Sequence, residues 1–228
     1  MRYALRVSIT PFGFFVISHK SCNMKIAIFG ASGRSGILTV FQALEKGHRV
    51  TAFARNPASI TIQHKNLTVV RGDILEYDKV KQAVQGQEAV ISTLGVESKK
   101  KSTVLSEGTR NIVRAMEECG VRRFICMSSA GVLGNDGGFF YDKIIIPLFL
   151  NEIFRDKRRQ VEVIRQSSTD WVIVRPVGLT DAPKTGKYRI REGKPGSSTM
   201  PRADVADFML KLLTDTQYDH TLPAISSL

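Results

Sequence analysis

From Lys25 onward, the chain alternates short continuous apolar runs with segments of helical periodicity. The runs are rich in Val, Ile and Phe and lack regular polar alternation, which is typical of strands covered on both faces of a parallel sheet. Candidate strands span residues 25–29, 49–54, 67–71, 89–93, 123–127 and 171–175, and candidate helices span 35–46, 77–85, 103–119, 157–166 and 202–213. This order predicts a doubly wound α/β sheet with right-handed crossovers.

Length and composition favour one soluble domain. The chain has 228 residues, of which 43% are hydrophobic and 24% charged, so intrinsic disorder and fibrous classes are excluded. No apolar run reaches the roughly 18–20 residues of a membrane helix. The three cysteines form no CxxC pair, and the four histidines show no metal-ligand spacing, so we expect no metal site and a reducing, cytoplasmic location.

The formal net charge of +12 indicates a surface that attracts anions. The excess is not arranged as a basic arm or a recognition helix, and the run 99–101 is interpreted as a solvated loop. The sequence therefore predicts neither nucleic acid nor membrane partners. It predicts small molecules that carry a phosphate group.

Residues 1–23 form a basic, acid-free leader before the first candidate strand. The favoured interpretation is a spurious upstream extension with Met24 as the true start; a targeting peptide and an ordered extra strand are the alternatives. We expect the leader to be poorly ordered and the domain to span 24–228.

A glycine-rich loop, Gly-Ala-Ser-Gly-Arg-Ser-Gly, follows the first candidate strand and opens the first candidate helix. Glycines in such a loop permit a tight turn, a close approach of the backbone to a pyrophosphate, and helix–strand packing. Helix N–H groups and the helix dipole then face the phosphates. The context predicts a Rossmann-like dinucleotide site with contacts from Gly30, Ser32, Gly33, Arg34, Ser35 and Gly36.

The end of the second candidate strand indicates the preferred dinucleotide. An NAD site usually has an acid there for the ribose 2′-hydroxyl, but no acid lies between Glu45 and Asp73. Arg55 follows the strand instead, and with Arg34 it can bind a 2′-phosphate. We therefore predict NADP(H) rather than NAD.

The third and fourth candidate strands end in further cofactor candidates. Asp73 and Ile74 follow the third strand, where a carboxylate and an apolar side chain can flank the adenine. Thr93, Leu94 and Gly95 end the fourth strand. All of them fall at the carboxyl ends of parallel strands, where open α/β sheets bind ligands.

Four stretches give the chain a specific family resemblance. They are GASGRSG, RGDILEYDKV, VLSEGTRNIVRAMEECGVRRFICMSSAGVLG and KTGKYRIREGKPG with the later RADVADFMLKLL. The chain resembles atypical short-chain dehydrogenases/reductases with an NAD(P)H-binding, NmrA-like domain, and within them the biliverdin-IXβ reductase/flavin reductase group. The resemblance assigns Ser128 and Lys157 to the reacting region, and Ser129, Pro176, Val177 and Gly178 to the surroundings of the nicotinamide.

The sequence departs from the family pattern in two ways. The Tyr-x-x-x-Lys pair of classical members is missing, because Tyr141 is followed four residues later by Ile145. The histidine that the mammalian reductase has near Val177 is also missing. The first departure disfavours a phenol-driven alcohol dehydrogenase, and the second weakens the expectation of a tetrapyrrole substrate.

These features predict an NADPH-dependent oxidoreductase that transfers hydride to a planar acceptor such as a flavin, a quinone or a tetrapyrrole. The alternative is a non-catalytic NAD(P)H-binding redox sensor of the NmrA type, and a sugar epimerase or dehydratase is a weaker third. We expect a monomer or weak dimer, with a lid in 134–150 and a small excursion in 181–200.

Overall fold

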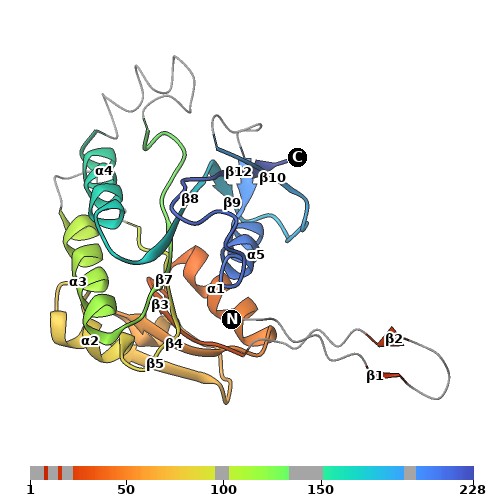
Figure 1. Cartoon of the computed structure of the whole chain (residues 1–228), viewed down its shortest axis with the longest axis horizontal. Coiled ribbons are helices and arrows are strands. Elements are labelled where there is room, and N and C mark those ends of the chain that lie inside the picture. Colours follow the sequence, from red (N-terminus) through yellow and green to blue (C-terminus); the bar gives the residue numbers. More distant parts are fainter. Residues whose placement is uncertain (1–7, 10–14, 17–22, 96–102, 134–150, 193–198) are drawn as a thin grey trace.

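The computed structural model describes residues 8–9, 15–16, 23–95, 103–133, 151–192 and 199–228 (Figure 1). Its main sheet has eight strands in the order β10-β12-β8-β7-β6-β3-β4-β5. Those strands are β3 (Lys25–Phe29), β4 (Arg49–Ala54), β5 (Leu67–Arg71), β6 (Ala89–Ser92), β7 (Arg123–Met127), β8 (Asp170–Pro176), β10 (Tyr188–Arg191) and β12 (Ala224–Ser227). The helices are α1 (Arg34–Glu45), α2 (Tyr77–Val84), α3 (Val104–Cys119), α4 (Asn151–Arg165) and α5 (Arg202–Lys211), with a 3₁₀ turn, η1, at Pro57–Ser59.

The sheet reverses its strand order beside β3. Strands β4 and β5 follow on one side of β3, whereas β6, β7 and β8 follow on the other, and all these neighbours pair in parallel. Such a reversal leaves a crevice at the carboxyl ends of β3 and β6, which is where open α/β sheets bind ligands. The predicted doubly wound, Rossmann-like sheet is therefore confirmed.

Helices cover both faces of this sheet. Helices α1 and α5 lie on one face, and α2, α3 and α4 lie on the other (Figure 1). On β3, Ile26 and Ile28 join the core under the first pair of helices, whereas Ala27 and Phe29 join the core under the other three. Because successive side chains of a strand point to opposite faces, a strand buried on both sides reads as a continuous apolar run.

The chain after β8, which includes the predicted excursion in 181–200, contains strands that the sequence pattern did not indicate. Strand β9 (Gly178–Thr180) pairs in parallel with β11 (Thr199–Pro201) in a separate two-stranded sheet. Strand β10 pairs antiparallel with β12, which extends the main sheet beside β8. The sheet is thus mostly, not wholly, parallel, and α4 begins at Asn151, ahead of the predicted start at Lys157.

Outside the domain, Ser8–Ile9 (β1) and Phe15–Val16 (β2) pair antiparallel. The predictions of a poorly ordered leader and of a lid in 134–150 otherwise fall outside the described residues, as do Tyr141 and Ile145. No helix in the described part is long and apolar enough to cross a bilayer.

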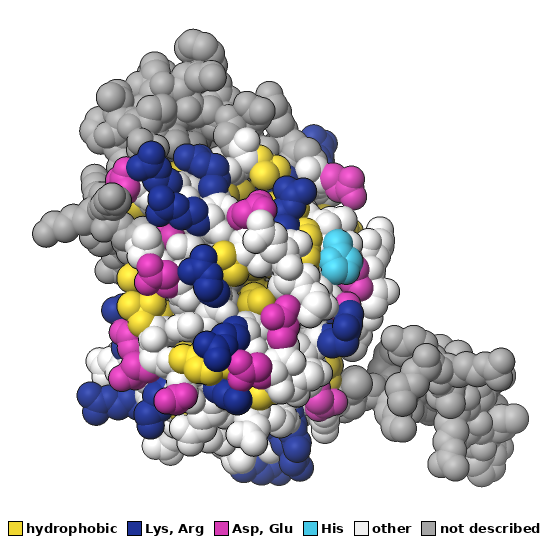
Figure 2. Space-filling model, turned by 60° about the vertical axis from the view of Figure 1, so that its left-hand side comes forward, with side chains coloured by type: hydrophobic (Ala, Val, Ile, Leu, Met, Phe, Trp, Pro, Cys, Tyr) yellow, Lys and Arg dark blue, Asp and Glu magenta, His cyan; other side chains and the backbone are white. Residues whose placement is uncertain are grey.

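The face formed by α2, α3 and α4 carries basic and acidic side chains interspersed with one another (Figure 2). Several of these charges are paired. Glu118 at the end of α3 binds Lys81 at 2.7 Å and Arg114 at 2.9 Å, and Arg122 binds Asp170 at 2.8 Å. The exposed pairs each contribute little to stability, but they keep this helical face from presenting a field of one sign.

Candidate functional site: a dinucleotide cradle

The glycine loop turns sharply between β3 and α1. Gly30 has a φ of +75°, a left-handed conformation that favours glycine, and the amide of Gly33 donates to its carbonyl at 3.0 Å. The amide of Ile37 donates to the Gly33 carbonyl at 2.9 Å, which is the first hydrogen bond of the helix. The three amides before Ile37 have no acceptor within the helix, and no side chain caps this end. They are available to an anion.

Glycine at position 36 is required by packing. A Cβ built on Gly36 would lie 2.1 Å from the Gly30 carbonyl oxygen, and one on Gly30 would lie 3.0 Å from backbone atoms of Thr93. Thr93 also ties the loop to β6, because its hydroxyl donates to the carbonyls of Phe29 at 3.0 Å and Gly30 at 3.2 Å. The cradle is therefore held by the ends of β3 and β6.

The remaining residues of the loop differ in exposure. Ser35 is buried and Ser32 is half-buried, whereas Gly33 and Arg34 are exposed. Leu94 is half-buried and Gly95 is exposed, with open space around a Cβ built on that glycine. The structure thus brings the glycine loop after β3 and the predicted residues Thr93, Leu94 and Gly95 after β6 to one edge of the sheet.

Arg34 forms an ion pair that the sequence did not indicate. Its guanidinium contacts the carboxylate of Asp181, which directly follows β9, and Arg202 binds the same carboxylate at 2.7 Å. Arg34 and Asp181 are both well exposed, with 67% and 58% of their side chains accessible. The arginine of the loop therefore points to the β9 side of the cradle.

Arg55 occupies the position predicted for recognition of the 2′-phosphate. It directly follows β4, is exposed, and forms no ion pair within the described ranges of the chain. The backbone beside it is fixed, because the amide of Gly72 donates to the carbonyl of Ala54 at 3.2 Å. The site thus offers one free guanidinium next to β4 and one held by Asp181.

Asp73 and Ile74 shape the end of β5. The Asp73 carboxylate accepts the amide of Leu75 at 2.9 Å, and its own amide donates to Glu76 at 2.9 Å, so this acid orders the turn into α2. Ile74 is buried and packs where a Cβ on Gly108 would collide with it. Asn111 holds the Ile74 carbonyl at 3.0 Å. Both residues have a structural role whether or not they contact a ligand.

Three buried serine hydroxyls lie at the carboxyl ends of β6 and β7. Ser128 and Ser129 follow β7, and Ser92 ends β6 beside Cys126 in the strand register. Ser92 is 0% exposed and its hydroxyl lies within hydrogen-bonding reach of the Cys126 thiol. Ser128 is 3% exposed, and neither its hydroxyl nor that of Ser129 has a hydrogen-bond partner among the described residues. A buried hydroxyl without a partner costs about 1–3 kcal/mol. A ligand at this edge would satisfy them.

Lys157 approaches the same region from α4. Burial lowers the pKa of its ammonium group, and the nearby Cys126 acts in the opposite direction. Burial also raises the pKa of the Cys126 thiol to about 12, so this cysteine is a neutral core side chain. Next to Lys157, the buried Asp156 accepts the amide of Leu105 at 2.9 Å and thereby fixes α4 against the first turn of α3.

The segment between β8 and β9 passes along the same edge. Pro176 is buried, Val177 is half-buried and Gly178 is exposed. Pro176 accepts a hydrogen bond from the amide of Ala130 at 2.8 Å, and Ser128 donates its amide to Val174 at 2.8 Å. The serines and this segment are thus held together by backbone hydrogen bonds.

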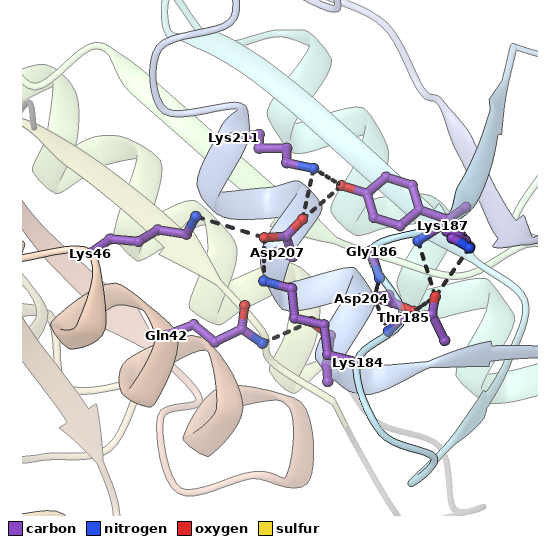
Figure 3. Close-up of polar contacts among 11 residues, drawn as sticks. Gln42, Lys46, Lys184, Thr185, Gly186, Lys187, Asp204, Asp207 and Lys211 are labelled. Atoms are coloured by element: carbon purple, nitrogen blue, oxygen red, sulfur yellow. Dashed lines mark hydrogen bonds and ion pairs between the residues drawn. The ribbon is translucent and has the colours of Figure 1, made fainter. Parts of the chain in front are cut away.

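A buried carboxylate on α5 gathers three lysines, one of which, Lys46, caps the carboxyl end of α1 away from the cradle (Figure 3). Asp207 binds Lys184 at 2.8 Å, Lys211 at 2.8 Å and Lys46 at 3.7 Å, and accepts the hydroxyl of Tyr188 at 3.0 Å. Burial alone would raise its pKa, but the hydrogen bonds from Lys184, Lys211 and Tyr188 outweigh it and lower the pKa to about 2. Asp207 is therefore ionised at neutral pH.

A second acid on α5 holds the neighbouring turn. Asp204 accepts the amides of Thr185 at 2.9 Å and Gly186 at 2.8 Å, together with the Thr185 hydroxyl at 2.7 Å (Figure 3). On α1, Gln42 donates to the Ala203 carbonyl at 2.8 Å. These contacts fasten the segment after β9 to α1 and α5 and so help to place Asp181 beside Arg34.

Sequence reasoning missed several residues of this arrangement. Asp181, Asp204 and Asp207 lie in stretches for which the sequence predicts an excursion and a helix, and Ser92 lies in a predicted apolar strand. The i, i+4 spacing of Asp207 and Lys211 was a visible signal for a helical ion pair. The other partners are brought together only by folding.

The described residues fit an NAD(P)H dinucleotide. The cradle leaves no room for a Cβ, its helix amides are free, and buried hydroxyls without partners lie at the adjoining strand ends. No group of three or more potential metal ligands occurs within the part of the chain that the structure describes. The donors at this site are backbone amides and hydroxyls, which suit the phosphate and carboxamide groups of a ligand.

Comparison with known proteins agrees with this geometry. The profile of the NAD(P)H-binding family matches residues 30–216. A 3-beta-hydroxysteroid dehydrogenase of Mycolicibacterium neoaurum is 33% identical over 48% of this chain, and the match covers 33% of the length of that enzyme.

Two solved structures share the fold. The oxidoreductase ylbE of Lactococcus lactis superimposes with a TM-score of 0.78 at 23% identity, covering 90% of this chain and 91% of that one. ChuY, an anaerobillin reductase from Escherichia coli O157:H7, gives a TM-score of 0.73 at 23% identity, covering 88% and 96%. The chain is a Rossmann-fold protein that belongs to the NAD(P)H-binding family and is similar to the atypical short-chain dehydrogenase/reductase oxidoreductases.

Proposed function

We propose that this protein is an NADPH-dependent reductase that transfers hydride to a planar acceptor such as a flavin, a quinone or a tetrapyrrole. The observation that carries the proposal is the pair of buried hydroxyls at Ser128 and Ser129, which have no partner among the described residues and follow β7, the strand next to β6. A bound nicotinamide would supply the hydride.

The chain's own groups suit positioning better than acid catalysis. Ser128 can donate a hydrogen bond to the carboxamide or to the acceptor, and Ser129 adds a second hydroxyl. Lys157 supports this region from α4. Holding two flat rings in register can supply a large part of the rate acceleration, because it removes their translational freedom. Acceptors that take hydride readily need no strong acid, and their proton can come from solvent.

The preference for NADPH rests on Arg55. A guanidinium directly after β4, with no ion pair in the described structure, suits a 2′-phosphate, whereas an NAD site would place a carboxylate there. Arg34 lies at the other side of the loop. It can bind a phosphate if its ion pair with Asp181 breaks.

Among acceptors, a tetrapyrrole has one additional support. ChuY, which shares the fold, is described as an anaerobillin reductase. The absence of a histidine near Val177 argues for a flavin or quinone instead. We further propose that the protein is cytoplasmic, acts as a monomer or weak dimer, and takes a small-molecule acceptor rather than nucleic acid or membrane.

One assay separates the reductase from the redox-sensor alternative. Purified protein is mixed with NADPH and FMN, and the absorbance of the reduced nicotinamide is followed, with a quinone and biliverdin in parallel. Turnover that saturates with NADPH supports the reductase. Tight NADPH binding by calorimetry without turnover of any acceptor favours the sensor, and an absence of NADPH binding contradicts both.

A further inference from the structure

A polar hollow lies at the opposite end of the strands from the glycine cradle. This amino-edge pocket has a volume of about 310 Å³ and lies where β3, β4 and β5 begin. Since β3 has five residues at about 3.3 Å each, its two ends are separated by about 17 Å. The pocket lining includes Lys25, Arg49, Thr51, Lys65, Thr68 and Gln87.

Strand register places four of these side chains on one face of the sheet. Lys25 pairs with Arg49, and Thr51 pairs with Thr68 on the next strand. Arg49 and Thr51 are two residues apart and therefore point to the same side of β4. Their side is the face covered by α2, because the intervening Val50 belongs to the core under α1 and α5.

Two hydrogen bonds fix the walls of the amino-edge pocket. The side-chain amide of Gln87, in the connection from α2 to β6, donates to the Thr51 hydroxyl at 3.1 Å. The amide of Val50 donates to the carbonyl of Asn66 at 2.8 Å, so the start of β5 is held next to β4. Lys25, Arg49, Thr51 and Thr68 therefore project from paired strands, and Lys65 and Gln87 project from the adjoining turns.

The charge of this pocket is one-sided. Lys25, Arg49 and Lys65 line it, and no carboxylate does. Across the described ranges, none of these three cations forms a salt bridge. Glu88 lies nearby, where its carboxylate accepts the backbone amide of Lys25 at 2.8 Å, so one acid offsets part of the charge of the three cations. Like charges side by side on neighbouring strands repel, and an anion between them would reverse the sign of the interaction.

We propose that the amino-edge pocket binds the phosphate group of a small phosphorylated molecule, separately from the dinucleotide cradle. Arg49 offers a planar pair of donors to phosphate oxygens, and Lys25 and Lys65 add point charges. Hydroxyls of Thr51 and Thr68 supply neutral donors beside them. A volume of about 310 Å³ lies at the lower limit of ordinary ligand pockets. The site does not depend on the proposed reaction.

The test is calorimetric titration of inorganic pyrophosphate into protein already saturated with NADP, so that the cradle is occupied. Pyrophosphate is expected to bind the NADP-saturated protein. Arg49→Gln should weaken its binding about tenfold, as expected for the loss of one charge-assisted pair, and Lys65→Gln should weaken it in the same direction. Arg189→Gln on β10 removes the same charge from another exposed strand position and is the matched control.

Titration of inorganic phosphate and of adenosine 5′-monophosphate under the same conditions identifies the source of the phosphate. Tighter binding of the nucleotide supports an organic phosphate, and equal binding supports the free ion. Absence of heat with all three probes overturns the proposal. Equal losses in Arg49→Gln and Arg189→Gln would also overturn it, because attraction would then come from net charge alone.

Discussion

Arg34, in the glycine loop, is ion-paired with Asp181, which follows β9 and lies far along the chain. Arg202 holds the same carboxylate at 2.7 Å, and the contacts of Asp204 and Asp207 fasten the adjoining segment. A phosphate in the cradle must therefore compete with Asp181 for the guanidinium of Arg34. Asp181 therefore weakens the electrostatic attraction between the guanidinium of Arg34 and a bound phosphate.

Asp181→Asn should increase affinity for NADPH. Because the Arg34–Asp181 pair is exposed, its loss is worth at most about 1 kcal/mol, so the gain is about two- to fivefold. Fluorescence titration with NADPH measures it. Asp78→Asn on α2 removes the same charge away from the cradle and should leave affinity unchanged; equal gains in both variants would show a net-charge effect.

Arg55→Ala should separate the two dinucleotides. Loss of a guanidinium from the 2′-phosphate weakens NADPH binding about tenfold, whereas NADH, which lacks that phosphate, should change by less than about twofold. Parallel titrations with both cofactors give the result, and Arg189→Ala serves as the control. An equal effect on NADPH and NADH would contradict the assignment of Arg55.

Gly36→Ala should destabilise the protein and weaken cofactor binding together. The added methyl would lie 2.1 Å from the Gly30 carbonyl oxygen, so the loop must shift. The cost is about 2 kcal/mol or more, measured by urea unfolding. Gly95→Ala has open space around the added Cβ and should stay within about 0.5 kcal/mol; a comparable loss there would contradict the packing argument.

Ser128→Ala should slow NADPH oxidation while raising the free energy of unfolding by about 1 kcal/mol, because a buried hydroxyl without a partner is removed. The contrasting variant is Ser106→Ala, whose hydroxyl donates to the buried carboxylate of Asp156. That variant should be less stable than the parent. Destabilisation by Ser128→Ala would show that its hydroxyl is already satisfied without a ligand.

Asp207→Asn should lower the free energy of unfolding by about 2 kcal/mol at neutral pH, as expected for a pKa lowered from 3.8 to about 2. A carboxylate whose pKa is lower in the folded state stabilises the fold fully at pH values above its pKa in the unfolded state. This stabilisation is lost as the pH falls through the pKa of the folded state. The difference between parent and variant should therefore shrink between pH 4 and pH 2. Urea unfolding at several pH values tests this, and a constant difference would exclude ionisation of Asp207 as the cause.

The sequence predicted those features that depend on neighbours along the chain. Continuous apolar runs identified β3 to β8, and the spacing of Gly30, Gly33 and Gly36 identified the turn into α1. Short strands such as β10 and β12 were missed, because their few residues carry no periodic signal. They are stabilised by pairing with each other and with β8.

By itself, the sequence determined the doubly wound sheet, the glycine cradle and the presence of Arg55 after β4. Strands buried on two faces appear in the sequence as continuous apolar runs, and a tight turn appears as spaced glycines, so both can be recognised from the order of residues. Tertiary structure alone decided that Asp181 meets Arg34, that Asp207 collects three lysines, and that Ser92 joins Ser128 at one edge. Those groups come from distant segments. Only the packing of α1 and α5 brings the charged groups within contact distance, and only the pairing of β6 with β7 brings the two serines to the same edge of the sheet.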